Sequence, residues 1–97
     1  MNTDIPPMIY FDKVTKHYRD GTPALDDVTL SIAPKEFVSI VGHSGAGKTT
    51  LLKMLLAEDA PTSGTVFFES VDVHSIPKGS LHNYRRKIGM VFQDFRL

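Results

Sequence analysis

The chain has 97 residues and a formal net charge of zero, because 11 lysines and arginines balance 11 aspartates and glutamates. This length allows one small domain and not two, and the balanced charge argues against a dedicated nucleic-acid binder. The sequence contains no cysteine, which excludes disulfides and thiolate metal sites. No apolar run reaches the roughly 18 residues that span a bilayer, so a role at a membrane would require a partner protein.

Strand patterns dominate the first part of the chain. Residues 8–11 are apolar and rich in strand formers, and Val28–Ile32 alternates so that its three aliphatic side chains share one face. Turn signals follow each strand pattern, at residues 20–23 and 33–36. We therefore expect two half-buried strands here.

The middle of the chain predicts a buried strand, a loop and a helix. Phe37–Val41 is apolar without alternation, which is typical of a strand covered on both faces. A glycine-rich loop follows, and residues 49–58 are apolar nearly all round, which predicts a helix buried on several sides. Residues 60–64 contain the proline and glycine that end this helix.

Three further elements are expected near the end of the chain. Residues 65–69 predict a short strand, and residues 80–87 predict a helix with Ser80 as its N-cap. Residues 88–92 are apolar and predict a last strand. Strands alternating with helices in this way indicate an α/β fold.

The loop matches the pattern Gly-x-x-x-x-Gly-Lys-Ser/Thr, which binds phosphates. Its glycines let the backbone approach the phosphates closely, and successive N–H groups and the following helix N-terminus favour anionic oxygens. Lys48 would contact the β- and γ-phosphates, Thr49 would ligate Mg²⁺, and Thr50 would donate to the α-phosphate. We therefore predict that the chain binds a purine nucleoside triphosphate, ATP, together with Mg²⁺. The candidate nucleotide ligands in and after the loop are Gly42, His43, Ser44, Gly45, Ala46, Gly47, Lys48, Thr49 and Thr50.

The loop, the Pro61–Gly64 stretch and the Val91–Gln93 stretch together resemble the nucleotide-binding domain of ATP-binding cassette (ABC) proteins. The resemblance runs from about Ile9 to Leu97. It implies an α/β P-loop NTPase fold, of which residues 1–97 form the N-terminal part of a single ATP-binding domain, cut off after the Q-loop. That part would hold an antiparallel β-subdomain and the start of the parallel core sheet. Arg85–Leu97 is most similar to the cell-division branch of the family, and methionine importers are similar except after the glutamine.

The resemblance also implies roles for two residues outside the loop. Tyr18 matches the aromatic residue that stacks on adenine, and the alternative is a tyrosine in the core or on the surface. Gln93 matches the Q-loop glutamine, which contacts Mg²⁺ or the attacking water; the alternative is an ordinary polar residue after a strand. Lys48 and Gln93 are thus the catalytic candidates, and Thr49 and Gln93 the metal candidates.

Partners are implied by the same resemblance. Gln93, Asp94, Phe95 and Arg96 would contact an integral membrane subunit of the FtsX type, although Phe95 could equally belong to the core. The full-length protein would pair with a second ATP-binding subunit as a homodimer, in the cytoplasm, peripheral on the inner face of the cell membrane. The basic run 85–87 reads as a solvated helix face, and no nucleic-acid partner is expected.

The 97 residues depart from the family pattern in one respect. They contain no Leu-Ser-Gly-Gly-Gln signature, and no counterpart of the aspartate, general-base glutamate and switch histidine that follow it in the family. We expect these residues alone to turn over little or no ATP, and expect an open strand edge at Phe37–Val41 to favour aggregation. Two alternative functions stay open, a transport ATPase of an importer or exporter and a non-catalytic nucleotide-binding module.

Overall fold

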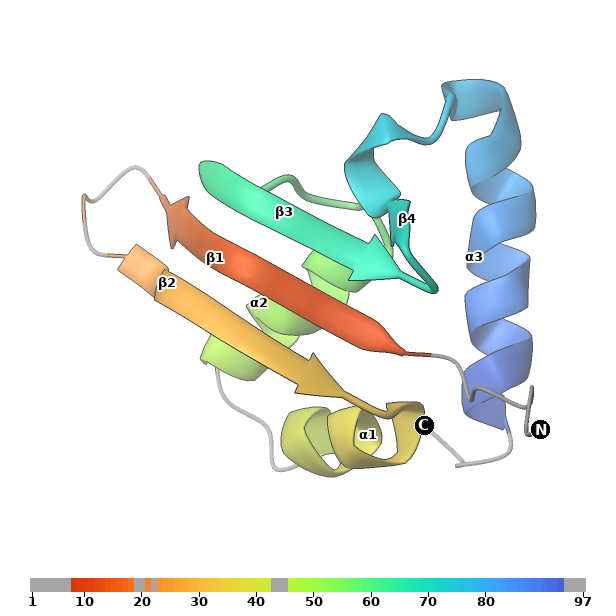
Figure 1. Cartoon of the computed structure of the whole chain (residues 1–97), viewed down its shortest axis with the longest axis horizontal. Helices are drawn as coiled ribbons and strands as arrows, with labels where there is room; N and C mark the ends of the chain where they lie inside the picture. The colour runs from red at the N-terminus through yellow and green to blue at the C-terminus, as the bar shows by residue number, and fades with distance from the viewer. Residues whose placement is uncertain (1–7, 19–20, 22, 43–45, 94–97) are drawn as a thin grey trace, which may run out of the picture.

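An antiparallel sheet with strand order β2-β1-β3-β4 organises the fold. The computed structural model describes residues 8–18, 21, 23–42 and 46–93. The strands are β1 (Ile9–His17), β2 (Pro23–Ile32), β3 (Ser63–Phe68) and β4 (Val71–Asp72). The helices are α1 (Pro34–Gly42), α2 (Ala46–Leu55), the 3₁₀-helix η1 (Val73–Ser75) and α3 (Lys78–Gln93). In Figure 1, α2 lies behind the sheet and α3 runs across the strand direction at one end of it.

Strand β1 is central and confirms the first strand prediction. Ile9 pairs with Ile32 of β2 on one side and with Phe68 of β3 on the other, and all three side chains are buried. In β2, Thr29 and Ser31 are exposed while the aliphatic residues between and beside them face inward. The alternation in the sequence therefore reports the buried face of β2 correctly. The short strand predicted at residues 65–69 is also present, as part of β3.

A β-bulge at Lys13 keeps β1 in register with the core. Lys13 has a positive φ of 51°, and its backbone N–H donates to the Thr29 hydroxyl at 3.0 Å. The pairing shifts between Phe11 and Val14, so that Val14 stays fully buried although it is an odd number of positions away. The bulge thus returns the hydrophobic side chains to one face.

Helix α1 replaces the strand that the sequence predicts at Phe37–Val41, so that prediction is wrong. Pro34 occupies the first helical position, and the Glu36 carboxylate accepts a hydrogen bond of 2.9 Å from the Ala33 backbone N–H. These features start a helix here, although the same residues also suit the turn that was expected. A helix pairs its own backbone groups, whereas a central strand needs neighbours on both sides. The expected open strand edge at these residues is therefore absent from the described structure.

Helix α3 runs through the segment predicted as a last strand, which is the second error. It spans Lys78–Gln93, so Ser80 lies in its first turn and is not its cap. Ile88 and Phe92 are both buried, while Met90 between them is 69% exposed. Burial at a spacing of four residues is a helical pattern, not a strand pattern. The described sheet consequently contains no parallel strand pair, and the predicted start of a parallel core sheet is not formed.

The core lies between the sheet and the helices. Phe37 stacks against Phe11 of β1 and against Phe92 of α3, with ring centroids 6.5 and 5.8 Å apart. This row of rings joins three elements that are distant in sequence. The buried apolar side chains are Ile9, Phe11, Val14, Leu25, Ile32, Phe37, Leu51, Met54, Leu55, Val66, Phe68, Val73, Ile88 and Phe92. None of the helices in the described part of the chain is long and apolar enough to cross a membrane.

Side chains of α3 cap the C-terminal end of α2. The Tyr84 hydroxyl donates to the Leu55 carbonyl oxygen at 2.7 Å, and the Arg85 guanidinium donates to the carbonyl oxygens of Leu56 (2.9 Å) and Ala57 (3.2 Å). The last carbonyls of a helix have no partners within it, so these bonds satisfy groups that would otherwise need water. Burial raises the pKa of Tyr84 well above its ordinary value of 10.0.

Replacing Tyr84 by phenylalanine is expected to lower the free energy of unfolding by about 1–2 kcal/mol, because the Leu55 carbonyl loses its donor. Urea unfolding followed by circular dichroism measures this at neutral pH. The raised pKa means that neutral Tyr84 contributes stability below pH 10 that is lost as the pH rises toward the folded-state pKa. The difference in the free energy of unfolding between wild type and Tyr84→Phe should therefore shrink above pH 10. As a control, Tyr10→Phe, at an exposed position, should change the free energy of unfolding little. If the difference in the free energy of unfolding stayed the same above pH 10, burial would not be stabilising the neutral form of Tyr84.

Candidate nucleotide-binding site

The phosphate-loop sequence leads directly into the N-terminus of α2. Gly42 ends α1, and Ala46, Gly47, Lys48 and Thr49 form the first turn of α2. The first N–H groups of a helix have no intrahelical acceptors, so this turn can offer donors to an anion. His43, Ser44 and Gly45 lie outside the described residues, as does the side chain of Lys48. The predicted helix after the loop is present, whereas the element before the loop is a helix and not the predicted strand.

Two predicted site residues from different parts of the chain meet beside α2. The Tyr18 hydroxyl lies 3.4 Å from the Thr50 hydroxyl. Thr50 is 4% exposed, and Tyr18, at the end of β1, is 42% exposed. Thr49, the neighbour of Thr50, is exposed. The predicted adenine residue therefore lies next to the helix that carries the predicted phosphate ligands.

Two residues that were not predicted from the sequence hold Tyr18. The Tyr18 hydroxyl donates to one carboxylate oxygen of Asp59 at 3.1 Å, and Lys16 Nζ donates to the other at 2.9 Å. Lys16 Nζ also lies 5.1 Å from the centroid of the Tyr18 ring, in a cation–π contact. The alternation of a strand places Lys16 and Tyr18 on one face, which the sequence could have indicated. Asp59, which is 41 positions from Tyr18, is brought there only by the fold.

The surroundings of the Asp59 carboxyl group favour its ionised form. The hydrogen bond from Lys16 is the main cause that lowers the pKa of Asp59 below its ordinary value of 3.8, and burial opposes it by raising the pKa. Hydrogen bonds from the Ala60 N–H and the Tyr18 hydroxyl lower the pKa further. A lowered pKa means that the stabilisation is present above the ordinary value and is lost as the pH falls through the folded-state pKa. At neutral pH, Asp59 is therefore a permanent acceptor for Tyr18.

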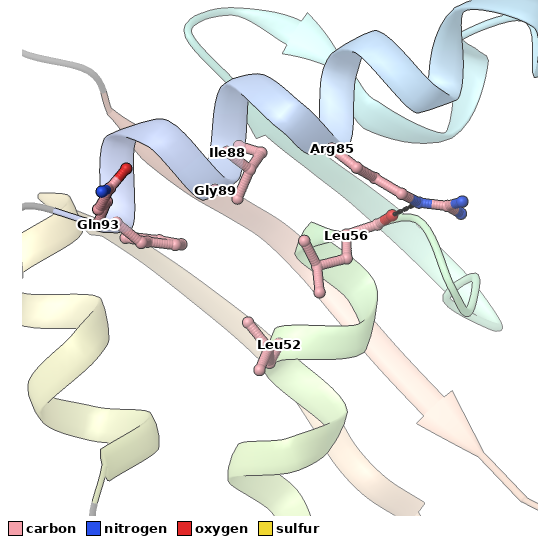
Figure 2. A pocket seen from close by; sticks show the side chains of 7 residues that line it. Leu52, Leu56, Arg85, Ile88, Gly89 and Gln93 are labelled. Atoms are coloured by element: carbon pink, nitrogen blue, oxygen red, sulfur yellow. Dashed lines mark hydrogen bonds between the residues drawn. The ribbon is translucent and has the colours of Figure 1, made fainter. Parts of the chain in front are cut away.

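Gln93 is the last residue of α3. It is exposed, and it lines one end of a groove of about 400 Å³ between α2 and α3 (Figure 2). Leu52 of α2 lines the same groove, three positions after Thr49. The groove is lined by Leu52, Leu56, Arg85, Ile88, Gly89, Phe92 and Gln93. Asp94, Phe95 and Arg96, predicted to contact a membrane partner, lie outside the described residues.

The Mg²⁺ ion predicted at Thr49 and Gln93 would be held chiefly by the nucleotide. The Thr49 hydroxyl and the Gln93 amide are hard oxygen ligands of the kind that Mg²⁺ accepts. Among the described residues, no group of three or more histidines and carboxylates converges on a point where a metal could sit. Mg²⁺ typically uses one or two protein ligands together with phosphates and water, rather than an all-protein cage. The residues present therefore suit a metal that arrives with a triphosphate.

The Gly-x-x-x-x-Gly-Lys-Thr sequence, followed by a helix that begins within it, indicates a nucleotide-binding domain of the P-loop class. The sequence profile described as "ABC transporter" matches residues 25–97, and the chain belongs to this family. Its fold resembles the ATP-binding cassette MJ0796, solved as a dimer in a post-hydrolysis state bound to ADP and Pi, with a TM-score of 0.61 and 30% identity over 80% of this chain and 35% of that one. The predicted fold class is thus confirmed at the level of the family.

Two curated relatives are similar over nearly the whole chain. The cell division ATP-binding protein FtsE of Bacillus subtilis is 44% identical over 90 residues, which cover 93% of this chain and 40% of that protein. The methionine import ATP-binding protein MetN of Corynebacterium efficiens is 41% identical over 93 residues, covering 92% of this chain and 26% of that protein. The chain therefore spans less than half the length of the relatives that it matches.

Proposed function

We propose that this chain binds ATP with Mg²⁺ through residues 42–50 and Tyr18. The observation that carries the proposal is the contact between the Tyr18 and Thr50 hydroxyls, because it brings an exposed aromatic ring beside the helix that begins at the phosphate loop. An aromatic ring stacks on a base without reading its edges, and a helix N-terminus attracts phosphate. One site would thus bind both ends of the nucleotide.

Each loop residue then has a role in the proposed complex. The backbone N–H groups of residues 45–49 would donate to phosphate oxygens, and the Lys48 ammonium would neutralise the β- and γ-phosphates. Mg²⁺ would be ligated by Thr49 and Gln93 and would supply charge stabilisation for phosphoryl transfer. Thr50 would donate to the α-phosphate. Lys48 and Gln93 are the residues of this chain proposed to act in hydrolysis by the whole protein.

The whole protein is proposed to be an ATP-binding subunit that powers a membrane complex in cell division. Residues 1–97 would be the N-terminal part of its single ATP-binding domain. Support comes from the similarity to the cell-division protein over nearly all of this chain. Gln93–Arg96 would contact an FtsX-like membrane subunit, and two ATP-binding subunits would pair as a homodimer on the cytoplasmic face of the membrane.

A transport ATPase is the second candidate, and the similar identity to a methionine importer favours it. Depletion of the full-length protein separates the two functions. A cell-division role predicts filamentous cells with incomplete septa and normal methionine uptake, whereas an importer role predicts the reverse. If the protein were instead a non-catalytic nucleotide-binding module, the wild type would bind ATP. The Lys48→Ala variant would then change neither cell division nor transport.

Isothermal titration calorimetry of the chain with Mg²⁺ and a non-hydrolysable ATP analogue tests the binding proposal. We expect saturable heat for the wild type and about tenfold weaker binding for Tyr18→Ala, because base–aromatic stacking is lost. Inorganic tripolyphosphate, which has no base, should bind both proteins equally. Tyr10→Ala is the matched control, since Tyr10 is an exposed tyrosine of β1 that stacks on Phe67. A folded wild-type sample that gives no heat with the analogue would refute the proposal.

A further inference from the structure

Lys16 and Asp59 form an ion pair that contacts Tyr18 in two places. We propose that this pair, here called the Lys16–Asp59 clamp, positions the Tyr18 ring for the base and leaves only one ring face free to stack on it. The inference rests on the proposed function, because it assigns a positioning role within the same site. Asp59 fixes the Tyr18 hydroxyl through a 3.1 Å hydrogen bond, and Lys16 covers one face of the ring.

Lys16 is held too firmly to move aside for a ligand. Its ammonium donates to Asp59 at 2.9 Å and to the Ala60 carbonyl oxygen at 2.8 Å, and its side chain is only 14% exposed. Moving Lys16 aside would break both of these charge-assisted hydrogen bonds and would leave the Asp59 carboxylate without its cationic partner. A base would therefore stack on the ring face opposite Lys16.

Asp59 is itself fixed from three parts of the chain. Its carboxylate accepts hydrogen bonds from Lys16 and Tyr18, at the end of β1, and from the Ala60 backbone N–H at 2.9 Å. Its backbone carbonyl lies 2.8 Å from Nε2 of His74 in η1. A carbonyl oxygen only accepts, so the His74 Nε2 atom carries the proton in this contact. A carboxylate restrained in this way can hold the Tyr18 hydroxyl in one position.

The clamp also sets the direction of the contact between Tyr18 and Thr50. A phenol has one proton, and in Tyr18 that proton is directed at the Asp59 carboxylate. In the 3.4 Å contact with Thr50 the Tyr18 oxygen can therefore act only as an acceptor. Asp59 thus orients the ring without reaching the phosphates, which makes it a positioning residue and not a catalytic one.

The test compares ligands with and without a base on the 97-residue chain. Calorimetry measures the affinity of wild type, Asp59→Asn and Lys16→Met for Mg²⁺ with a non-hydrolysable ATP analogue and for Mg²⁺ with tripolyphosphate. We expect both variants to bind the analogue about tenfold more weakly, as on loss of one stacking interaction, and to bind tripolyphosphate within about twofold of wild type. Lys16→Arg keeps the charge and should restore most of the affinity for the analogue.

The controls and outcomes separate this inference from the proposed function. Glu58→Gln removes an exposed carboxylate next to Asp59 and should leave both affinities unchanged. An equal loss for both ligands, or no loss for the analogue, would overturn the clamp while ATP binding by the wild type stood. Binding of neither ligand by the wild type would overturn both proposals. If Asp59→Asn fails to fold by circular dichroism, Lys16→Met and Tyr18→Phe, which removes only the hydroxyl, decide the outcome by the same comparison.

Discussion

Replacing Lys48 by alanine is expected to weaken binding of the ATP analogue with Mg²⁺ by about two orders of magnitude. In the proposed complex the Lys48 ammonium faces the β- and γ-phosphates, and removing one partner of a close charge pair costs about 2–5 kcal/mol. Calorimetry or equilibrium dialysis measures the change. The loss should extend to tripolyphosphate, because Lys48 contacts phosphates and not the base. This distinguishes Lys48→Ala from the variants at Tyr18 and in the Lys16–Asp59 clamp.

Lys53→Ala provides the matched control for Lys48→Ala. Lys53 lies in the last turn of the same helix and is exposed, so its removal lowers the charge of the chain equally without touching the loop. We expect the affinities of this variant to stay within about threefold of wild type. An equal effect of the two substitutions would mean that general electrostatic attraction, and not a cradle at the start of α2, binds the triphosphate.

Replacing Gly64 by alanine is expected to lower the free energy of unfolding by at least about 3 kcal/mol. Gly64 lies near the start of β3, at the bulge of β1, and has a φ of +89°. A Cβ atom there would overlap the Lys13 carbonyl oxygen, and it would lie 2.6 Å from the Lys13 carbonyl carbon and 2.7 Å from the Asp12 carbonyl oxygen. Both neighbours are backbone, which cannot rotate away as a side chain could. Urea unfolding followed by circular dichroism measures the loss.

Two other glycines separate backbone strain from steric overlap. Gly21 has a φ of +81° and no atom within 4 Å of the place a methyl group would take, so Gly21→Ala reports strain alone and should cost about 1 kcal/mol. Gly79, in the first turn of α3, has open space and an ordinary φ. Gly79→Ala should therefore be neutral or stabilise by up to about 1 kcal/mol. If Gly64→Ala cost no more than Gly21→Ala, the close approach of β3 to the bulge would not matter for stability.

Parts of β1, β2 and β3 and helix α2 could be predicted from the sequence because their signals are local, whereas the two-residue strand β4 was not predicted. Alternation in Val28–Ile32 reports a strand with one buried face, and the apolar cluster that includes Leu51 and Met54 reports a buried helix. Family membership also follows from local patterns, since the phosphate loop, the Pro61–Gly64 stretch and the Val91–Gln93 stretch are each contiguous in the chain. The assignment of nucleotide ligands within that loop remains a prediction from the sequence.

The two wrong strand predictions show where local patterns are ambiguous. Short apolar runs such as residues 37–41 and 88–92 suit a buried strand or a buried helix equally well. Pro34 and the Glu36 carboxylate at the start of α1 suit a turn, and they also initiate helices. In α3, Phe92 stacks on Phe37 and Ile88 is buried in the same core, so packing against residues far away in the sequence selects the helical spacing.

The sequence by itself determined the family, the phosphate-loop motif and the alternating faces of the strands, because each depends on residues that are neighbours along the chain. The tertiary structure alone decided that residues 37–41 and 88–92 are helical, and that Asp59 meets Lys16 and Tyr18 next to Thr50. Contacts between residues 30 or more positions apart form only when the sheet and helices pack together. In that packed state the hydrogen bond from Lys16 lowers the pKa of the Asp59 carboxyl, so the fold sets the geometry of the carboxylate and extends its ionised form to lower pH.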